Sequence, residues 1–136
     1  MKFVVEDGGF APVREHATDA GIDLKLPEDV CVDAYGSERV DLKLRVEIPN
    51  GYVGLLTSKS GLMDKDIKTT GTIDCGYSGT IGCRIFNHGE IPRYFKRGDK
   101  ITQLVVLPCI MDNVEIVDEI TAGDRGENGF GSTGRK

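Results

Sequence analysis

The chain has 136 residues, of which 29% are charged and 39% hydrophobic, and this predicts one globular domain with a sizeable core. The formal net charge of -5 argues against a nucleic-acid partner, which would need a basic surface, although a few local cations would suffice for a phosphorylated small molecule. The N-terminus lacks an apolar signal core, and no apolar run approaches the roughly 18 residues of a membrane helix. We therefore expect no membrane partner and a cytoplasmic location.

The clearest periodic segment covers residues 39–48, where apolar side chains alternate strictly with charged ones. A period of two predicts a β-strand with one buried face. The tripeptide Pro-Asn-Gly at 49–51 follows, and Asn and Gly tolerate the positive φ of a tight turn. We expect residues 52–56 to form the returning strand.

Other short apolar segments, punctuated by Gly and Pro, predict further strands. These strands are expected at residues 2–5, 21–26, 79–87, 101–107 and 114–117. One helix of a turn or two is expected around residues 60–65. Many short strands at this spacing predict an all-β sandwich or barrel.

The chain has four cysteines: Cys31, Cys75, Cys83 and Cys109. None forms a C-x-x-C pair, and no signal peptide is evident, so we expect neither a zinc site nor a disulfide framework. Reduced thiols in or near the core are the expected state.

The C-terminal residues 123–136, GDRGENGFGSTGRK, differ in composition from the rest. They contain five glycines and one large apolar residue, Phe130, so they cannot bury enough surface to order themselves. Two interpretations stay open on composition alone. The segment is a frayed end, or it is a lid that grips phosphate through Arg125 and a Ser-Thr pair between glycines.

Two glycine-containing segments are candidates for ligand binding. Residues 58–62, SKSGL, place a cation and two hydroxyls where a strand ends; these groups can hold phosphate oxygens or serve as a simple helix N-cap. Residues 71–79, GTIDCGYSG, place an acid three residues before an aromatic. A hairpin there would put Asp74 beside a ligand with Tyr77 packed against it; the alternative is an Asx-type turn.

Two single residues are further candidates. Asp23 lies at the start of a predicted strand beside small residues, where it could hold a hydrated Mg²⁺ or simply be solvated. Gln103 lies between apolar neighbours in a segment predicted to be buried. A buried amide needs a partner, which the protein, water or a ligand can provide.

Five segments, taken together, resemble the motifs of one enzyme family. In chain order they are ATDAGIDL, SKSGL, GTIDCGYSG, RGDKITQLVV and RGENGFGSTG. Their order is similar to the five-motif pattern of the trimeric dUTPase family, with G-x-I-D-x-x-Y-x-G and the last motif the most specific. The resemblance extends from residue 17 to the C-terminus.

This resemblance implies a small jelly-roll-like β barrel at residues 1–122 and a flexible Gly-rich C-terminal arm at residues 123–136 that closes the active site. It implies a homotrimer with three active sites at subunit boundaries. The implied reaction is hydrolysis of dUTP to dUMP and pyrophosphate with Mg²⁺ as cofactor, which keeps uracil out of DNA and supplies dUMP for dTMP synthesis. Water would attack the α-phosphorus in line, with Mg²⁺ bridging the phosphates.

The resemblance also assigns roles in nucleoside binding. By matched position, Asp74 would deprotonate the attacking water and touch the sugar 3′-hydroxyl. Tyr77 would pack beneath the deoxyribose and leave no room for a 2′-hydroxyl. Backbone groups of the 72–82 hairpin would select uracil, because cytosine would leave buried groups unpaired. The matched substrate-binding positions are Gly71, Thr72, Ile73 and Gly82.

Other matched positions concern the triphosphate. Gln103 would lie near the phosphates and the attacking water, and Asp23 would hold Mg²⁺ through water. From the arm, Arg125 would reach the γ-phosphate and Phe130 would stack on uracil. The remaining matched phosphate-binding positions are Lys59, Ser60, Gly61, Gly131, Ser132 and Thr133.

Three features depart from the family's usual pattern. Lys59 stands where arginine is usual, which keeps the charge but loses the bidentate fork. The stretch from Gly61 to Gly71 is short and lacks the usual histidine, which bears on trimer contacts. In the arm, Glu127 and Asn128 replace a small residue and a glycine.

Two alternatives share this fold. A dCTP deaminase would need a glutamate base and an arginine-rich phosphate segment, whereas the matched acid here is Asp74. The other alternative adds regulatory binding of a protein partner to catalysis, as in some viral and phage members of the family. If the chain is viral, the expected location is the host cytoplasm.

Overall fold

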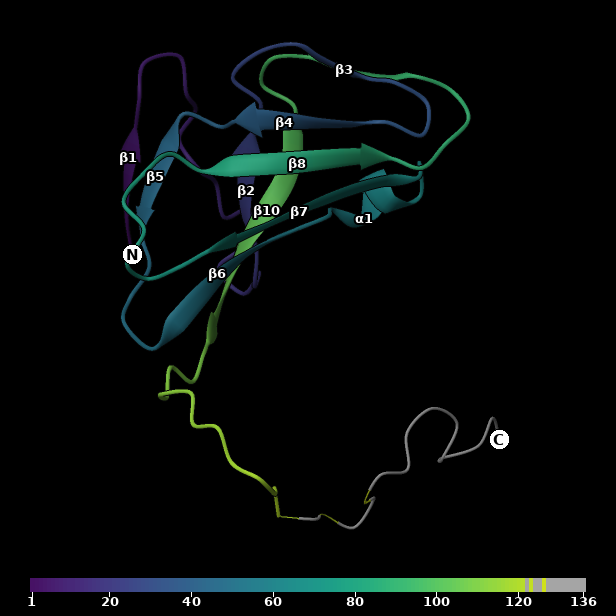
Figure 1. Ribbon diagram of the computed structural model, residues 1–136. Coiled ribbons are helices and arrows are strands. Elements are labelled where there is room, and N and C mark those ends of the chain that lie inside the picture. The colour runs from purple at the N-terminus through teal and green to yellow at the C-terminus, as the bar shows by residue number, and fades with distance from the viewer. Residues whose placement is uncertain (122, 124–125, 127–136) are drawn as a thin grey trace.

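The computed structural model describes residues 1–121, 123 and 126, which form an almost all-β fold (Figure 1). The strands are β1 (Lys2–Val5), β2 (Ile22–Lys25), β3 (Val30–Val32), β4 (Ser37–Asp41), β5 (Leu44–Glu47), β6 (Tyr52–Thr57), β7 (Ile67–Ile73), β8 (Gly82–Asn87), β9 (Arg93–Phe95) and β10 (Lys100–Pro108). One short helix, α1 (Ser60–Met63), follows β6. The predicted fold class and the predicted short helix are confirmed.

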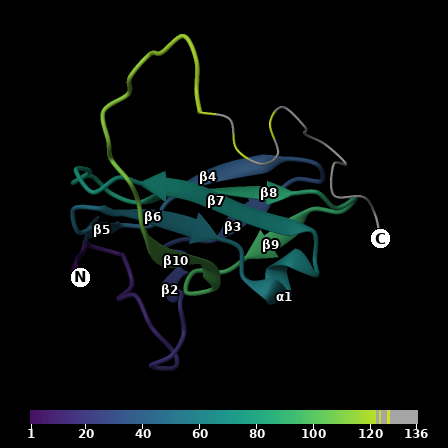
Figure 2. The same ribbon diagram turned by 90° about the horizontal axis from the view of Figure 1, so that it is seen from below.

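The strands form one large sheet and two small ladders. The large sheet has the order β2-β10-β6-β7-β8-β4, and each neighbouring pair is antiparallel. The pairs β1–β5 and β3–β9 form the ladders. Figures 1 and 2 show the large sheet curling, with β5 at the opposite end from α1. A curled antiparallel sheet flanked by short ladders is the expected jelly-roll-like barrel.

The core is one apolar cluster enclosed by these strands. β2 contributes Leu24 to the core and β10 contributes Ile101 and Leu104, all fully buried. Asn87 is a buried polar residue at the end of β8. Its amide nitrogen donates to three backbone carbonyls around β3 and β9, which satisfies the amide and fixes that ladder against β8.

The alternating segment 39–48 keeps its predicted burial but is not one strand. Its apolar side chains are all buried, yet β4 belongs to the large sheet while β5 pairs with β1. Lys43 separates them with a φ of 56°, and the Asp41 carboxylate accepts a hydrogen bond from the Lys43 N–H at 2.8 Å. Across the break, the Ile81 N–H donates to the Leu44 carbonyl at 2.7 Å. The expectation of a single strand is wrong. Alternation predicts which side chains are buried, but it does not predict strand pairing, and one residue in the left-handed region lets the chain change its partner strand.

The expected hairpin around residues 49–51 is also wrong. Residues 52–56 do form a strand, but β6 pairs with β7 and β10 rather than with β5. Gly51 has the positive φ of 80° expected for the turn. The turn therefore passes the chain from the β1–β5 ladder into the large sheet. The predicted strands corresponding to β1, β2, β8 and β10 are confirmed, with ends shifted by a few residues at most.

Three strands and one segment were not predicted correctly. β3 and β9 are only three residues long, and β7 alternates isoleucine and threonine inward with polar residues outward, so none gives a clear apolar period. Residues 114–117 are not a strand: Val114 and Ile116 are each 95% exposed, where the chain leaves the sheet after β10 (Figure 1). A strand needs a neighbour for its backbone groups, and no described strand of the same chain pairs with this segment.

Cysteine placement agrees only in part with expectation. All four thiols are free, and Cys83 is buried. Cys31 and Cys109 are exposed, so placing them in or near the core is wrong. Among the described residues, no helix has the length and apolar character needed to cross a membrane.

Candidate active site

Predicted phosphate-binding residues meet at one end of the large sheet. β6 ends at Thr57, Lys59 has extended backbone, and α1 then begins. On β10, Gln103 pairs with Thr57, so its side chain stands beside this strand–helix turn. One cavity of about 320 Å³ is lined by Lys59, Ser60, Gly61, Leu62, Lys100 and Gln103. The second and fourth motifs of the sequence are therefore brought together.

Asp23 is the acid of this cluster and is paired with two lysines. Its side chain is only 10% exposed; it accepts a hydrogen bond from Lys59 Nζ, and its other oxygen lies 3.0 Å from Lys100 Nζ. Burial opposes ionisation of Asp23, but the hydrogen bonds from Lys59 and Lys100 outweigh it, so the pKa of Asp23 lies below its ordinary value. The carboxylate is charged at neutral pH and holds both lysines at the cavity.

Lys100 is a site residue that the sequence did not reveal. A strand period of two would place Lys100 and Gln103 on opposite faces, because they are three residues apart. A register shift between Lys100 and Thr102 interrupts the β2–β10 pairing, and both side chains line the same cavity. Hydrogen bonds to Glu15 and Asp23 raise the pKa of Lys100, so its positive charge is secure.

Gln103 has the partner that its position requires. Its Nε2 donates to the Ser58 carbonyl at 3.2 Å. Gly21 makes room for the amide, since a Cβ at that position would lie 2.8 Å from Gln103 Cδ. Gln103, Gly21, Asp23 and Lys59 also line a neighbouring cavity of about 420 Å³. The first, second and fourth motifs thus share one polar region.

The third motif forms the connection between β7 and β8, as the predicted hairpin requires. Gly71, Thr72 and Ile73 end β7, and Gly82 begins β8. Asp74 is exposed, and its carbonyl accepts a hydrogen bond from the Tyr77 N–H at 3.0 Å, which closes a turn. Tyr77 is 47% exposed and therefore accessible to a ligand.

A chain of hydrogen bonds anchors Tyr77. Its hydroxyl donates to the Thr80 carbonyl at 2.9 Å, and the Thr80 hydroxyl donates to the Asp41 carboxylate at 3.0 Å. Burial opposes ionisation of Asp41, but hydrogen bonds from the Lys43 N–H and the Thr80 hydroxyl keep its pKa below the ordinary value. The break between β4 and β5 is therefore also the anchor of the Tyr77 loop.

One chain does not bring Asp74 and the phosphate cluster together. Gln103 lies opposite Thr57, which lies opposite Thr70 on β7. Asp74 follows further along the β7 direction, roughly 13 Å beyond Thr70 at about 3.3 Å per residue. Figure 1 shows the same separation, with α1 at one end of the sheet and the β7–β8 connection at the other.

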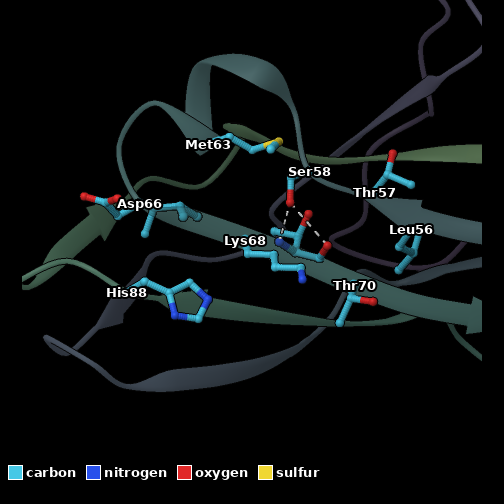
Figure 3. A pocket seen from close by; sticks show the side chains of 10 residues that line it. Leu56, Thr57, Ser58, Met63, Asp66, Lys68, Thr70 and His88 are labelled. Carbon is cyan, nitrogen blue, oxygen red and sulfur yellow. Dashed lines mark hydrogen bonds between the residues drawn. The ribbon is translucent and has the colours of Figure 1, made fainter. Parts of the chain in front are cut away.

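A further cavity of about 520 Å³ on the β6–β7 surface contains none of the predicted site residues (Figure 3). Its lining is mostly apolar and includes Leu56, Met63 and the His88 ring. Beneath it, the Thr69 N–H donates to Ser58 Oγ at 2.8 Å, so β7 is tied to the end of β6.

The predicted arm contacts lie outside the described residues. These positions are Arg125, Phe130, Gly131, Ser132 and Thr133, together with the departures at Glu127 and Asn128. Their roles remain predictions. The described residues 109–121 that lead toward them run away from the sheet (Figure 1).

The fold and the cluster define a class: a jelly-roll-like β-domain in which lysines, a hydroxyl and the start of a short helix line one cavity, and groups of this kind can hold phosphate oxygens. A glycine-framed Asp-Tyr hairpin lies at the far end of the sheet and holds the other predicted site residues. The chain belongs to the dUTPase family, whose family model matches residues 9–134. The predicted family is confirmed.

Curated relatives are similar over most of their length. The deoxyuridine 5'-triphosphate nucleotidohydrolase of Anaeromyxobacter sp. is 38% identical over 120 residues, which cover 85% of this chain and 82% of the relative. The enzyme of the same name from Gloeothece citriformis is 37% identical over 134 residues, covering 96% and 92%. The similarity therefore spans both the sheet and the C-terminal segment.

Solved structures are similar in fold as well. The Staphylococcus bacteriophage 80alpha dUTPase with dUPNHPP has a TM-score of 0.91 at 31% identity, covering 98% of this chain and 97% of that one. A mutant dUTPase of phage phi11 of S. aureus, in which a structural Mg(II) ion is coordinated, has a TM-score of 0.79 at 31% identity, covering 87% and 96%. These likenesses confirm the fold.

Proposed function

We propose that the chain is a dUTP diphosphatase that hydrolyses dUTP to dUMP and pyrophosphate. The observation that supports this proposal is that the candidate site has two separate parts. A cation-rich cavity at α1 suits the triphosphate, and the separate Asp74–Tyr77 loop suits the nucleoside. Family membership adds the reaction, because the relatives carry that enzyme's name along nearly the whole chain.

The active site is assembled from more than one copy of the chain. We infer that Asp74 of the partner subunit completes the cavity, because the two parts lie at opposite ends of one sheet (Figure 1). The segment after β10 supports an assembly: its apolar side chains Ile110, Val114, Ile116 and Ile120 are 84–95% exposed. Exposed apolar side chains gathered in one segment mark a surface suited to contact with another chain. We assign a homotrimer, as the resemblance implies.

The phosphate end holds and orients the substrate. Lys59 and the Ser60 hydroxyl, with the N–H groups at the start of α1, hold phosphate oxygens. Gln103 stands where the attacking water and the α-phosphorus meet. The partner subunit's Asp74 accepts a proton from that water. At the same time the water oxygen bonds to the α-phosphorus, and the bond from phosphorus to the pyrophosphate oxygen breaks. Positioned charge accounts for most of the rate gain.

The nucleoside end selects base and sugar. Tyr77 is held by its hydroxyl, so its ring is a fixed floor beneath the deoxyribose and excludes a 2′-hydroxyl. Backbone donors and acceptors between Gly71 and Gly82 select uracil, because cytosine would leave one of them unpaired. A fixed ring discriminates better than a mobile one, since it cannot move aside.

Magnesium fits the donor set of the phosphate end. Asp23 is an ionised carboxylate at the cavity whose two oxygens are paired with Lys59 and Lys100, so it would act on a metal ion through bridging water rather than directly. Mg²⁺ is commonly held by one or two carboxylates together with substrate phosphates and water. Asp23 would hold the ion through water. When bound, Mg²⁺ would neutralise charge that develops on the leaving pyrophosphate.

In this proposal residues 1–122 are the barrel domain, with 109–121 as the segment that leaves its sheet, and residues 123–136 act as the arm. Arg125 would contact the γ-phosphate and Phe130 would stack on uracil. The remaining arm contacts to phosphate would come from Gly131, Ser132 and Thr133. Closure would exclude water and complete the site.

The test is pyrophosphate release, with Mg²⁺, from dUTP, dTTP, dCTP and UTP in parallel. Release from dUTP alone supports the reaction, the base choice and the sugar choice together. No release from any nucleotide refutes the enzymatic proposal. Ammonia from dCTP would instead identify a deaminase.

A second role is binding of a protein partner. Phage dUTPases, among them the similar enzyme of phage 80alpha, control transfer of virulence genes by a proto-oncogenic G protein-like mechanism. Capture of a defined partner by an Asp74→Ala variant, which lacks catalysis but keeps its surface, supports this role for the present chain. Absence of any stoichiometric partner from the native cell contradicts it.

A further inference from the structure

The short strand β9 carries an arginine where its pattern calls for an apolar side chain. Arg93 and Phe95 share the inward face of β9, whereas Tyr94 points outward and is 75% exposed. Phe95 packs against the core as expected. Arg93 Nε is buried and finds no hydrogen-bond partner among the described residues. An N–H buried without a partner is destabilising, so it calls for an acceptor from outside the described chain.

Arg93 lines a cavity of about 500 Å³ between α1 and β9. Lys65 and Lys100 share its lining with a single carboxylate, that of Asp99. The Asp99 carboxylate already accepts a hydrogen bond from the Lys96 N–H at 2.8 Å. Cations therefore outnumber carboxylates around a space large enough for a small anion.

This cavity adjoins the phosphate end of the active site, since both are lined by Leu62 and Lys100. We propose that Arg93 and Lys65 bind a free inorganic phosphate group, either orthophosphate or the pyrophosphate product, at a site separate from the substrate triphosphate. The planar guanidinium fork suits two oxygens of one phosphate. The identification with product rests on the proposed function, whereas the anion site does not.

Calorimetric titration of the full chain with sodium pyrophosphate, and separately with sodium phosphate, tests the site without nucleotide or divalent metal. We expect two pyrophosphate ions per wild-type chain, one at the Lys59 cluster and one at Arg93. Arg93→Gln and Lys65→Gln should each weaken the second binding event by about tenfold or more. Arg97→Gln is the matched control, because it removes the same charge from a guanidinium that lies over the Phe10 ring at 4.4 Å.

Turnover of dUTP by the same variants separates this site from the substrate site. We expect kcat and KM to stay within about twofold of wild type. A large rise in KM for Arg93→Gln would place Arg93 in the substrate site and overturn the proposal. Unchanged pyrophosphate binding would overturn it too, and so would a changed oligomeric state in light scattering, because Arg93 would then be a contact between copies.

The two anions distinguish the source of the ligand. Tighter binding of pyrophosphate favours the product as the ligand, whereas tighter binding of orthophosphate favours free phosphate, and both support the anion site. If wild type releases no pyrophosphate from dUTP but Arg93-dependent binding persists, the proposed function fails and the anion site stands.

Discussion

A shared active site predicts that two inactive variants restore each other's activity. Asp74→Asn removes the base at one end of the sheet, and Gln103→Ala removes the positioning amide at the other, so each alone should lose roughly 10²-fold or more in kcat. In a mixed assembly, an intact site needs Gln103 from one copy and Asp74 from its neighbour. With equal amounts and random assembly, each requirement is met half the time, so about a quarter of the sites should be intact.

The assay is pyrophosphate release after the two variants are unfolded and refolded together. Each variant refolded alone gives the background. Activity of the mixture at that background would refute the shared site, since a site within one chain cannot be repaired by another copy. Recovery near a quarter of wild type supports it.

A second mixture controls for poor refolding. The doubly substituted chain, Asp74→Asn with Gln103→Ala, is refolded with an equal amount of wild type. A site within one chain would leave about half of the activity, whereas a site shared by two copies leaves about a quarter. The two mixtures therefore give the same value only when the sites are shared.

Three further predictions follow from the site and the core. Gly21→Ala should push the Gln103 amide from its place and lower kcat/KM by about 10²-fold, with little change in Tm; unchanged kinetics would contradict the steric argument. Because the pKa of Asp23 is lowered, its stabilising contribution is present above the ordinary value of 3.8 and is lost as pH falls through the folded value. The difference in unfolding free energy between wild type and Asp23→Asn, from urea titrations, should therefore shrink below about pH 4. Burial raises the pKa of Cys83 to about 11, so a maleimide at pH 7 should label Cys109 rapidly and Cys83 only after unfolding.

The sequence predicted the features that depend on side-chain type and on local periodicity, namely burial and turns. The alternation in residues 39–48 identified every buried side chain of that run, and the glycine-framed Asp74–Tyr77 segment was correctly placed in a hairpin. The pairing of strands was less predictable. A single positive φ at Lys43 redirects the chain from one sheet to another, and lysine is not a residue type that marks such a turn.

The position of Lys100 shows a second limit. A sequence period assigns faces only while the strand is regular, and the register shift before Thr102 reverses the face of everything that precedes it. Val114 and Ile116 show a third limit, since an apolar segment with strand character becomes a strand only when a partner is beside it. Both incorrect predictions, the face of Lys100 and the strand at residues 114–117, concern contacts between distant segments rather than local propensity.

These irregular points coincide with the candidate site. Lys43 interrupts β4 and β5, and the carboxylate of Asp41 that caps this break also holds Thr80, which in turn holds Tyr77. The register shift in β10 brings Lys100 beside Asp23. A regular sheet would bury the same core without either arrangement. The departures from strand geometry are therefore best explained by the chemistry they position, because each places a polar group where regular alternation would not.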